Sequence, residues 1–277
     1  MSRDTSGVRS SERTSGSPEM RISSEIGAEG NSLTVTLFGQ TPLYHLTNRS
    51  LLVRYGYNYR NLNDDISGYD LKGKKHTHSI YAGLVGTQQM QGLMLNYNAN
   101  LTIGQLGLDS EYTRILGRLN DTKEGTYTKL EADATAVQRL GNMTDFLVKV
   151  SGQKASRNLD SSEEFYLGGP NGVRAYAQGE GAGDEGILAT AELRYHTPVR
   201  GLTFSTFYDV GSVRKSRAPL SEDNAITLRG WGLAAAYNNP GDWFARVDYA
   251  RRIGLDESVS AKNNARNRVW FMAGKIW

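Results

Sequence analysis

Apolar and polar side chains alternate along most of the chain from residue 30 onward. In residues 93–103, Leu, Tyr, Ala and Ile occupy the odd positions, and Asn or Thr occupies most of the even ones. A period of two residues places successive side chains on opposite faces of a β-strand. The pattern predicts about eleven strands, at residues 31–40, 49–60, 76–86, 92–104, 126–138, 143–155, 187–198, 201–213, 228–238, 243–253 and 267–277.

The strand lengths and the links between strands both favour a membrane barrel. Each predicted strand has about 10 to 13 residues, enough for a tilted strand to cross a bilayer and more than most soluble sheets use. Five short links, at residues 41–48, 87–91, 139–142, 199–200 and 239–242, alternate with five long ones, at residues 61–75, 105–125, 156–186, 214–227 and 254–266. Short turns on one side and long loops on the other are typical of outer-membrane barrels, whose short turns are periplasmic.

The predicted fold class is therefore all-β, a transmembrane antiparallel β-barrel. The longest nearly apolar windows, such as residues 231–237, are much shorter than the ~18 residues that a spanning helix requires. The mean hydropathy of −0.51 is compatible with barrel strands, because only alternate residues face lipid.

Composition excludes several classes of function. The chain has 32 Lys and Arg and 29 Asp and Glu, a net charge of +3, so nucleic acid is not an expected partner. It has no Cys, and therefore no disulfide framework, thiolate metal site or thiol nucleophile. The chain has 31 glycines and 15 tyrosines, a composition typical of strands and turns. We expect no cofactor and no metal.

The two ends of the chain differ in character. Residues 1–29 are rich in Ser, Arg, Gly and Glu and show no signal peptide, so we expect a loop or disordered lead-in. The last strand ends on aromatics, and Phe271 and Trp277 resemble the C-terminal signal of barrel proteins. Bacterial barrels have even strand numbers, whereas eleven is odd. Either a strand lies within residues 1–29 or the front of the barrel is missing.

Two motifs stand out from the alternating pattern. The long loop at residues 156–186 contains Phe-Tyr-Leu-Gly-Gly-Pro-Asn-Gly-Val-Arg-Ala-Tyr at 165–176, and a later strand contains Phe-Tyr-Asp-Val-Gly at 207–211. Here the chain resembles the TpsB transporters of two-partner secretion, which include the haemolysin and filamentous-haemagglutinin secretors. These belong to the wider superfamily of POTRA-bearing outer-membrane barrels. The family motifs are V-R-G-Y/F at the tip of a loop that folds back into the lumen, and F-x-D-x-G on an inner wall strand.

The resemblance implies a lock between the loop tip and the wall. Arg174 corresponds to the tip arginine and Asp209 to its carboxylate partner, and a guanidinium matches a carboxylate in a two-point bond. The remaining motif residues are Val173, Ala175 and Tyr176 at the tip and Phe207 and Gly211 on the strand, with loop glycines Gly168, Gly169 and Gly172. Ala175 stands where the family has Gly, and alanine allows the tip backbone less conformational freedom than glycine does.

The resemblance also implies a function. Five predicted strands follow the loop, as in the family's sixteen-stranded barrel, so residues 30–277 look like strands six to sixteen, the C-terminal part of the barrel. The family exports a secreted TpsA-type exoprotein, such as an adhesin, haemolysin or contact-dependent toxin, through the outer-membrane lipid. Because POTRA domains and earlier strands have no counterpart here, we interpret the chain as a truncated form that does not act alone. The alternative is a barrel that assembles other outer-membrane proteins, and an outer-membrane enzyme is the least favoured class.

Other candidate sites are weaker. Residues 179–183 are Gly-rich without the Lys-Ser/Thr of a phosphate loop, and the Ser-x-x-Lys at 151–154 ends a strand instead of opening a helix. His76 and His78 share one strand face, but no metal motif accompanies them. Charges predicted to face the lumen are expected mainly as the lining of any polar interior; they are Arg54, Lys129, Glu131, Asp133, Lys149, Glu192, Arg194, Arg246 and Asp248.

Overall fold

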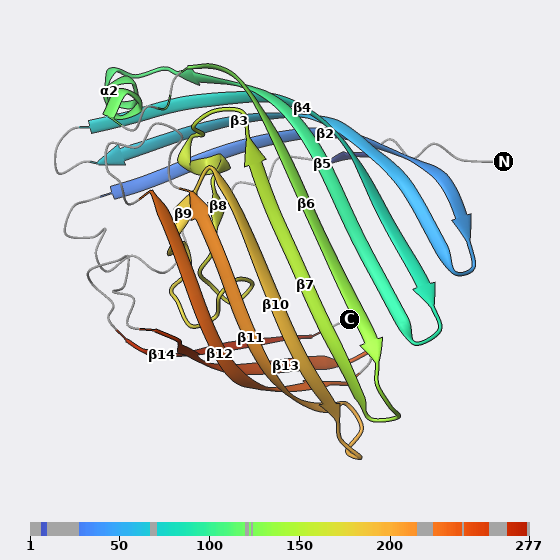
Figure 1. Cartoon of the computed structure of the whole chain (residues 1–277). Helices are drawn as coiled ribbons and strands as arrows, with labels where there is room; N and C mark the ends of the chain where they lie inside the picture. The colour runs from blue at the N-terminus through green and yellow to red at the C-terminus, as the bar shows by residue number, and fades with distance from the viewer. Residues whose placement is uncertain are drawn as a thin grey trace.

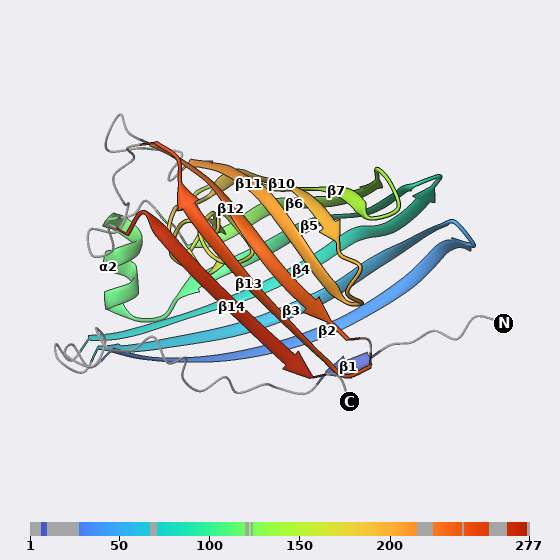
Figure 2. The same cartoon turned by 90° about the horizontal axis from the view of Figure 1, so that it is seen from below.

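A computed structural model describes residues 7–9, 28–66, 71–119, 122, 124–214, 224–239, 241–254 and 265–275 of the chain. Its main feature is one antiparallel sheet that curls around a concave side (Figures 1 and 2). The sheet strands are, in spatial order, β1 (Gly7–Arg9), β2 (Ala28–Leu46), β3 (Arg49–Ile66), β4 (Leu71–Met90), β5 (Leu93–Leu108), β6 (Gly125–Arg139), β7 (Thr144–Ala155), β10 (Glu185–His196), β11 (Leu202–Arg214), β12 (Ala225–Asn238), β13 (Trp243–Arg252) and β14 (Asn267–Lys275). The all-β prediction is confirmed.

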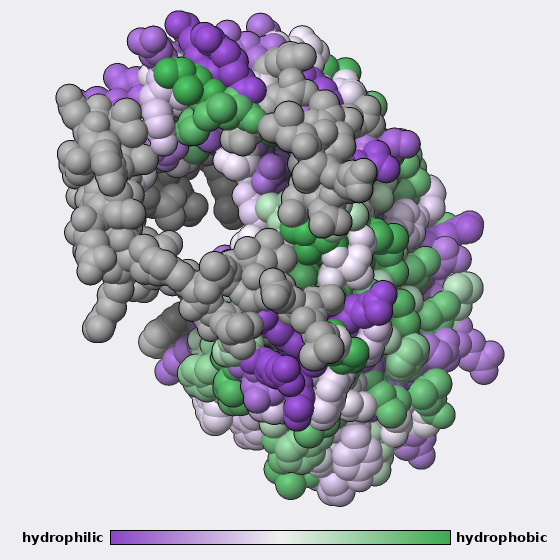
Figure 3. All heavy atoms as spheres, turned by 60° about the vertical axis from the view of Figure 1, so that its left-hand side comes forward, coloured by the Kyte–Doolittle hydropathy of each residue, from purple (hydrophilic) through white to green (hydrophobic). Residues whose placement is uncertain are grey.

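The alternation in the sequence maps onto the two faces of this sheet. On β11, Phe204 and Tyr208 are exposed on the outside, whereas Ser205, Phe207 and Asp209 are buried on the inside. The same outward exposure of apolar side chains recurs around the sheet, at Leu101, Leu130, Leu193, Leu233, Val247 and Phe271. Figure 3 shows hydrophobic residues along the outer wall, with hydrophilic residues between them and at the top of the view. This is the arrangement of a barrel wall in lipid.

Each of the eleven predicted strands overlaps one long strand of the sheet, but several ends were misplaced, and residues 92, 143, 197, 198, 201 and 253 lie outside the strands. The link at 41–48 is a two-residue turn at 47–48, because β2 continues past a bulge at Pro42. The long loop predicted at 61–75 is mostly strand, since β3 and β4 stay paired as far as Ile66 and Leu71. The side chains at 61–65 are mainly polar on both faces, so no alternation of apolar and polar residues predicts this part of the strand.

The loop predicted at 105–125 contains a helix, α2 (Glu111–Leu119). Ser110 caps it, because its hydroxyl accepts a hydrogen bond from the amide of Thr113 at 3.3 Å. The helix packs at the end of β4, where Thr113 lies beside Gly73. Among the described residues, no helix combines the length and apolar content that crossing a membrane would require.

The expected lead-in at residues 1–29 supplies part of the sheet. Gly7–Arg9 form β1, which pairs antiparallel with β2 opposite residues 36–38, and β2 itself begins at Ala28. At the other end, β14 pairs with β13, and the described residues show no pairing between β14 and β1 or β2. Trp277, predicted as part of the terminal signal, lies outside the described residues.

The main hydrophobic core lies on the concave side, between the long loop and the wall. The loop contains a short 3-10 helix at Ser161–Glu163 and a two-stranded ribbon of β8 (Phe165–Tyr166) and β9 (Ala182–Gly183), which Figure 1 shows inside the curve of the sheet. Loop residues form this core together with wall residues of β10 to β13; they are Leu167, Val173, Ala175, Tyr176, Leu188, Phe207, Val213, Ile226, Leu228, Ala234 and Ala250. The fold thus buries the loop tip against the inner wall.

Candidate functional site: the loop tip on the inner wall

Glycines shape the path of the loop before its tip. Gly169 has a φ of 124°, a backbone conformation that residues other than glycine rarely adopt. Gly172 has no room for a Cβ, which would collide with the carbonyl oxygen of Leu167. That carbonyl accepts a hydrogen bond of 2.7 Å from the amide of Val173, which closes the turn and aims the next residue at the wall.

The structure brings Arg174 and Asp209 together as a two-point ion pair. Arg174 donates from Nε to Asp209 Oδ2 and from Nη2 to Oδ1, each at 2.9 Å. The amide nitrogen of Arg174 also donates to Oδ2 at 3.1 Å, and the Thr190 hydroxyl donates to Oδ1 at 2.9 Å. Asp209 is 0% exposed. A carboxylate so fully removed from water requires such partners, and here both oxygens have them.

The remaining guanidinium nitrogen of Arg174 contacts two further carboxylates. Nη1 donates to Glu192 Oε2 at 3.2 Å and to Asp248 Oδ1 at 3.0 Å. Arg246 bonds the same two carboxylates, at 3.2 Å and 2.8 Å, and completes the cluster. The Arg174 Cζ atom lies 3.2 Å from the centre of the Phe207 ring, so the guanidinium also stacks on an aromatic face.

Side chains of the last two strands hold the backbone of the tip. Trp270 of β14 donates from Nε1 to the carbonyl oxygen of Arg174 at 2.7 Å. Arg252 of β13 donates to the Ala175 carbonyl oxygen at 3.3 Å, and its Cζ lies 4.3 Å from the centre of the Tyr176 ring. These contacts satisfy two consecutive carbonyl groups that the loop turns toward the wall.

The wall also accommodates Ala175, which stands in place of the family glycine. A Cβ added to Gly230 of β12 would come within 2.7 Å of the Ala175 methyl group, so a glycine on the wall makes the room. Gly211 has a similar role, since a Cβ there would meet a methyl of Leu167 at 2.6 Å. Tyr176 and Val173 are fully buried beside these positions.

The other candidates lie elsewhere. Phe271 is 71% exposed on the outer face of β14. His76 and His78 also face outward, where His76 Nδ1 contacts Asp109 at 2.7 Å and His78 Nδ1 contacts the Tyr57 hydroxyl at 2.6 Å. Within the described ranges, no three His, Cys, Asp or Glu side chains gather as metal ligands.

Sequence reasoning placed Glu192, Arg246 and Asp248 in the lumen but did not connect them to the tip. One signal was available, because Arg246 and Asp248 stand two residues apart on one strand face. Trp270 and Arg252 were missed entirely. Their contacts depend on the position of a loop far away in the sequence, which alternation does not report.

A known sequence family matches most of the chain. The family model described as haemolysin secretion/activation protein ShlB/FhaC/HecB matches residues 5–237. The chain belongs to this family. It is an all-β outer-membrane protein of the TpsB type, and the family is one of transporters.

Two relatives found by sequence agree with this family assignment. The heme/hemopexin transporter protein HuxB of Haemophilus influenzae strain 86-028NP is 24% identical over 251 residues, which cover 88% of this chain and 44% of HuxB. HuxB of strain ATCC 51907 is 25% identical over 252 residues, with the same coverage of 88% and 44%. The chain therefore spans less than half the length of these relatives.

Solved structures share the fold. CdiB from Escherichia coli superposes with a TM-score of 0.71 at 16% sequence identity, covering 89% of this chain and 46% of CdiB. CdiB from Acinetobacter baumannii gives a TM-score of 0.67 at 15% identity, covering 89% and 42%. At these sequence identities the comparison shows the fold of the curled sheet and nothing more.

Proposed function

We propose that this chain forms part of an outer-membrane pore that exports a partner exoprotein in two-partner secretion. The observation that carries the proposal is the Arg174–Asp209 pair, in which a loop tip is fixed inside the curl of a barrel sheet. Family membership supports it, and so do relatives named as transporters. The partner is a secreted protein of the TpsA class, such as an adhesin, haemolysin or toxin.

In this proposal the tip residues act as a structural lock. Val173, Ala175 and Tyr176 fill the space between loop and wall, while Phe207 and Gly211 shape the wall that receives them. Gly168, Gly169 and Gly172 let the loop turn back, and Phe271 with Trp277 would serve as the assembly signal. Residues 30–277 would be the C-terminal part of the barrel. We infer no catalytic role, since the cluster is saturated by its own ion pairs.

Passive passage of the partner is what the TpsB resemblance implies, and a polar inner wall is compatible with it. The inward side chains are polar and charged, so an extended polypeptide can cross without binding tightly, and folding of the partner outside the cell would pull it through. The lock then fixes how much of the interior the loop occupies. Its loss would change passage while leaving the outer wall intact.

Co-expression of a full-length transporter that carries these strands with candidate exoproteins from the same genome tests the proposal. The exoprotein is quantified in the medium and the periplasm for the unaltered protein, Arg174→Ala, Asp209→Ala and the control Asp133→Ala, a carboxylate exposed on the inner face. We expect the lock variants to lower export about ten-fold or more, as loss of a buried charge pair should, and the control to match the unaltered protein. Export that does not depend on the protein would contradict the proposal. Broad loss of outer-membrane proteins on depletion would favour the assembly-factor alternative.

A further inference from the structure

A second set of ion pairs holds the base of the long loop, far along the sheet from the tip. Lys75 Nζ lies 2.9 Å and 3.0 Å from the two Asp160 oxygens. Glu163 receives Arg60 Nη1 at 3.1 Å on one oxygen and Lys129 Nζ at 2.9 Å on the other. We call these five residues the base clasp. None belongs to the tip motif or to the motif of β11.

The base clasp is ordered by the local structure of the loop. Asp160 caps the short helix Ser161–Glu163, accepting from the amide of Ser162 at 3.1 Å. Gln153 of β7 donates to the carbonyl oxygen of Glu163 at 3.0 Å. Both carboxylates are 12% exposed, so water screens these pairs less than it screens surface pairs.

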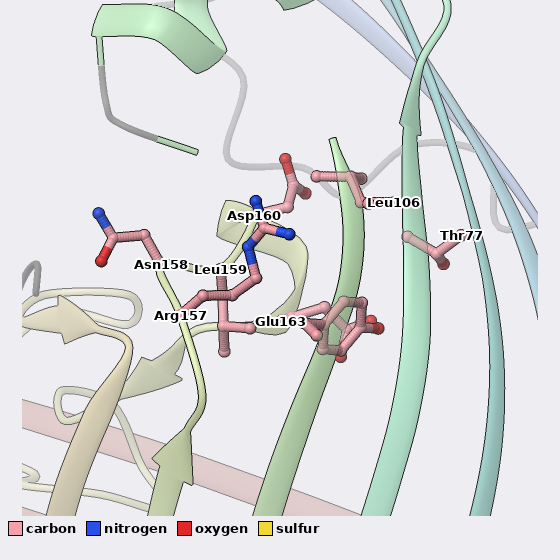
Figure 4. Close-up of a pocket in the computed structure, with 9 residues that line it drawn as sticks. Thr77, Leu106, Arg157, Asn158, Leu159, Asp160 and Glu163 are labelled. Atoms are coloured by element: carbon pink, nitrogen blue, oxygen red, sulfur yellow. The ribbon is translucent and has the colours of Figure 1, made fainter. Parts of the chain in front are cut away.

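The close-up in Figure 4 shows where the base clasp meets the wall. Asp160 and Glu163 come from the loop and lie beside Leu106 of β5 and Thr77 of β4. Tyr127 of β6 is among the residues that line the small pocket between them. The loop base therefore reaches toward the strands β3 to β6, away from the strands that hold the tip.

The two anchors use adjoining parts of the curled sheet and share no strand. The base clasp uses side chains of β3, β4 and β6, whereas the tip uses β10, β11, β13 and β14. Measured along the curved sheet, β4 and β13 are seven steps apart, about 34 Å at roughly 4.8 Å per step, and the nearest strands of the two sets, β6 and β10, are two steps apart. The loop joins them through a packed middle, where Leu167 is fully buried and its amide donates to the Gly181 carbonyl oxygen at 2.9 Å.

We propose that Asp160 and Glu163 are positioning residues that make the loop a brace across the concave side. With the tip fixed to one part of the sheet and the base to another, the loop sets the distance between the two parts and so the curvature of the wall. The competing explanation is local, in which these carboxylates only stabilise the short helix at residues 161–163. The inference concerns shape and holds whether or not the protein exports a partner.

Distance measurement between spin labels separates the two explanations. Labels at Ile80→Cys on β4 and Leu233→Cys on β12 lie on exposed outward positions, away from the loop. A second pair, Phe204→Cys on β11 and Val247→Cys on β13, reports on one part of the sheet only. The purified chain in detergent is compared with Asp160→Asn/Glu163→Gln, and the control is Glu131→Gln, whose carboxylate also contacts Lys129 but lies on β6 itself.

For the clasp variant we expect the β4–β12 distance distribution to become about two-fold wider, because one end of the brace is free, while the β11–β13 distribution stays narrow. Glu131→Gln should leave both distributions unchanged.

Lys75→Met should widen the first distribution and Lys75→Arg should keep it narrow. If the carboxylate variant fails to fold, judged by its heat-dependent electrophoretic mobility, the Lys75 pair decides alone. If the β4–β12 distribution keeps its width in the clasp variant, the loop does not act as a brace and the carboxylates have only a local role. Faster tryptic cleavage at Arg157 in that variant would not change this conclusion.

Discussion

At the residue scale, the ion cluster at the loop tip is asymmetric. Arg174 and Arg246 face three carboxylates, those of Asp209, Glu192 and Asp248. Removing one carboxylate leaves two positive and two negative groups, which can still pair. Removing Arg174 leaves three nearly buried carboxylates with one partner. Because an unpaired buried charge costs more than a lost hydrogen bond, the two ends of the lock should not be equivalent.

We therefore predict that Arg174→Gln destabilises the protein more than Asp209→Asn does. Loss of Arg174 should lower the free energy of unfolding by about 3–5 kcal/mol, because it breaks a buried ion pair and leaves the carboxylate partners uncompensated. Asp209→Asn should cost roughly 1–3 kcal/mol, because the amide keeps the shape and part of the hydrogen bonding. Urea unfolding in lipid vesicles measures both. A larger cost for Asp209→Asn would show that the carboxylate, not the guanidinium, carries the cluster.

How much of this site the sequence predicts depends on the residue. The resemblance of two short motifs implies the pairing of Arg174 with Asp209, and alternation gives the face of Asp209 on β11. Alternation does not give neighbours across strands, because these depend on register: Asp209 lies opposite Thr190 on one side and Gly230 on the other. Trp270 reaches the Arg174 carbonyl oxygen only because the sheet curls, which no local pattern encodes.

At the scale of elements, the middle of each strand was predictable and the ends were not. Alternation marks the part of a strand that separates an apolar from a polar environment. Beyond it, residues 61–65 of β3 are mainly polar on both faces, so a paired strand resembles a loop. Helix α2 was missed for another reason, because Tyr112, Ile115, Leu116 and Leu119 recur at helical spacing, and a search for two-residue alternation does not detect that period.

The long loop should respond to pH through Glu164, which lies outside the spanning strands. Burial, together with the nearby charges of Asp184 and Asp160, raises the pKa of Glu164 to about 7 from an ordinary value of 4.5. The folded state then holds its proton more tightly than the unfolded state. Stability is highest below pH 4.5, falls as pH rises through about 7, and is then constant with respect to this group.

We expect Glu164→Gln to remove this dependence. The melting temperature of the unaltered protein in detergent should fall between pH 5 and pH 8 more than that of the variant, and the two should differ most at pH 8, where Glu164 is ionised. Ser161→Ala, an exposed position in the same loop, is the control. Parallel melting curves for the unaltered protein and Glu164→Gln across this range would contradict the assigned environment.

At the scale of the whole molecule, the sheet separates two environments and the loop occupies one of them. Apolar side chains face outward along the strands, and the charged cluster, the base clasp and the core around Leu167 all lie inside the curl. The inner face therefore needs the loop for its packing, since its buried hydrophobic residues have no other cover among the described elements. The outer face needs lipid for the same reason.

The depth of the outward residues gives the last prediction. Leu233 lies near the middle of β12 and is 54% exposed, whereas Val199 lies in the short turn between β10 and β11 and is 58% exposed. Equal exposure with different depth makes them a matched pair. In lipid vesicles, Leu233→Lys should cost about 2–4 kcal/mol of unfolding free energy, because the ammonium enters the bilayer midplane, and Val199→Lys about 0–1 kcal/mol at the interface. Equal costs in urea titrations would mean that the outer face of the sheet does not lie against hydrocarbon.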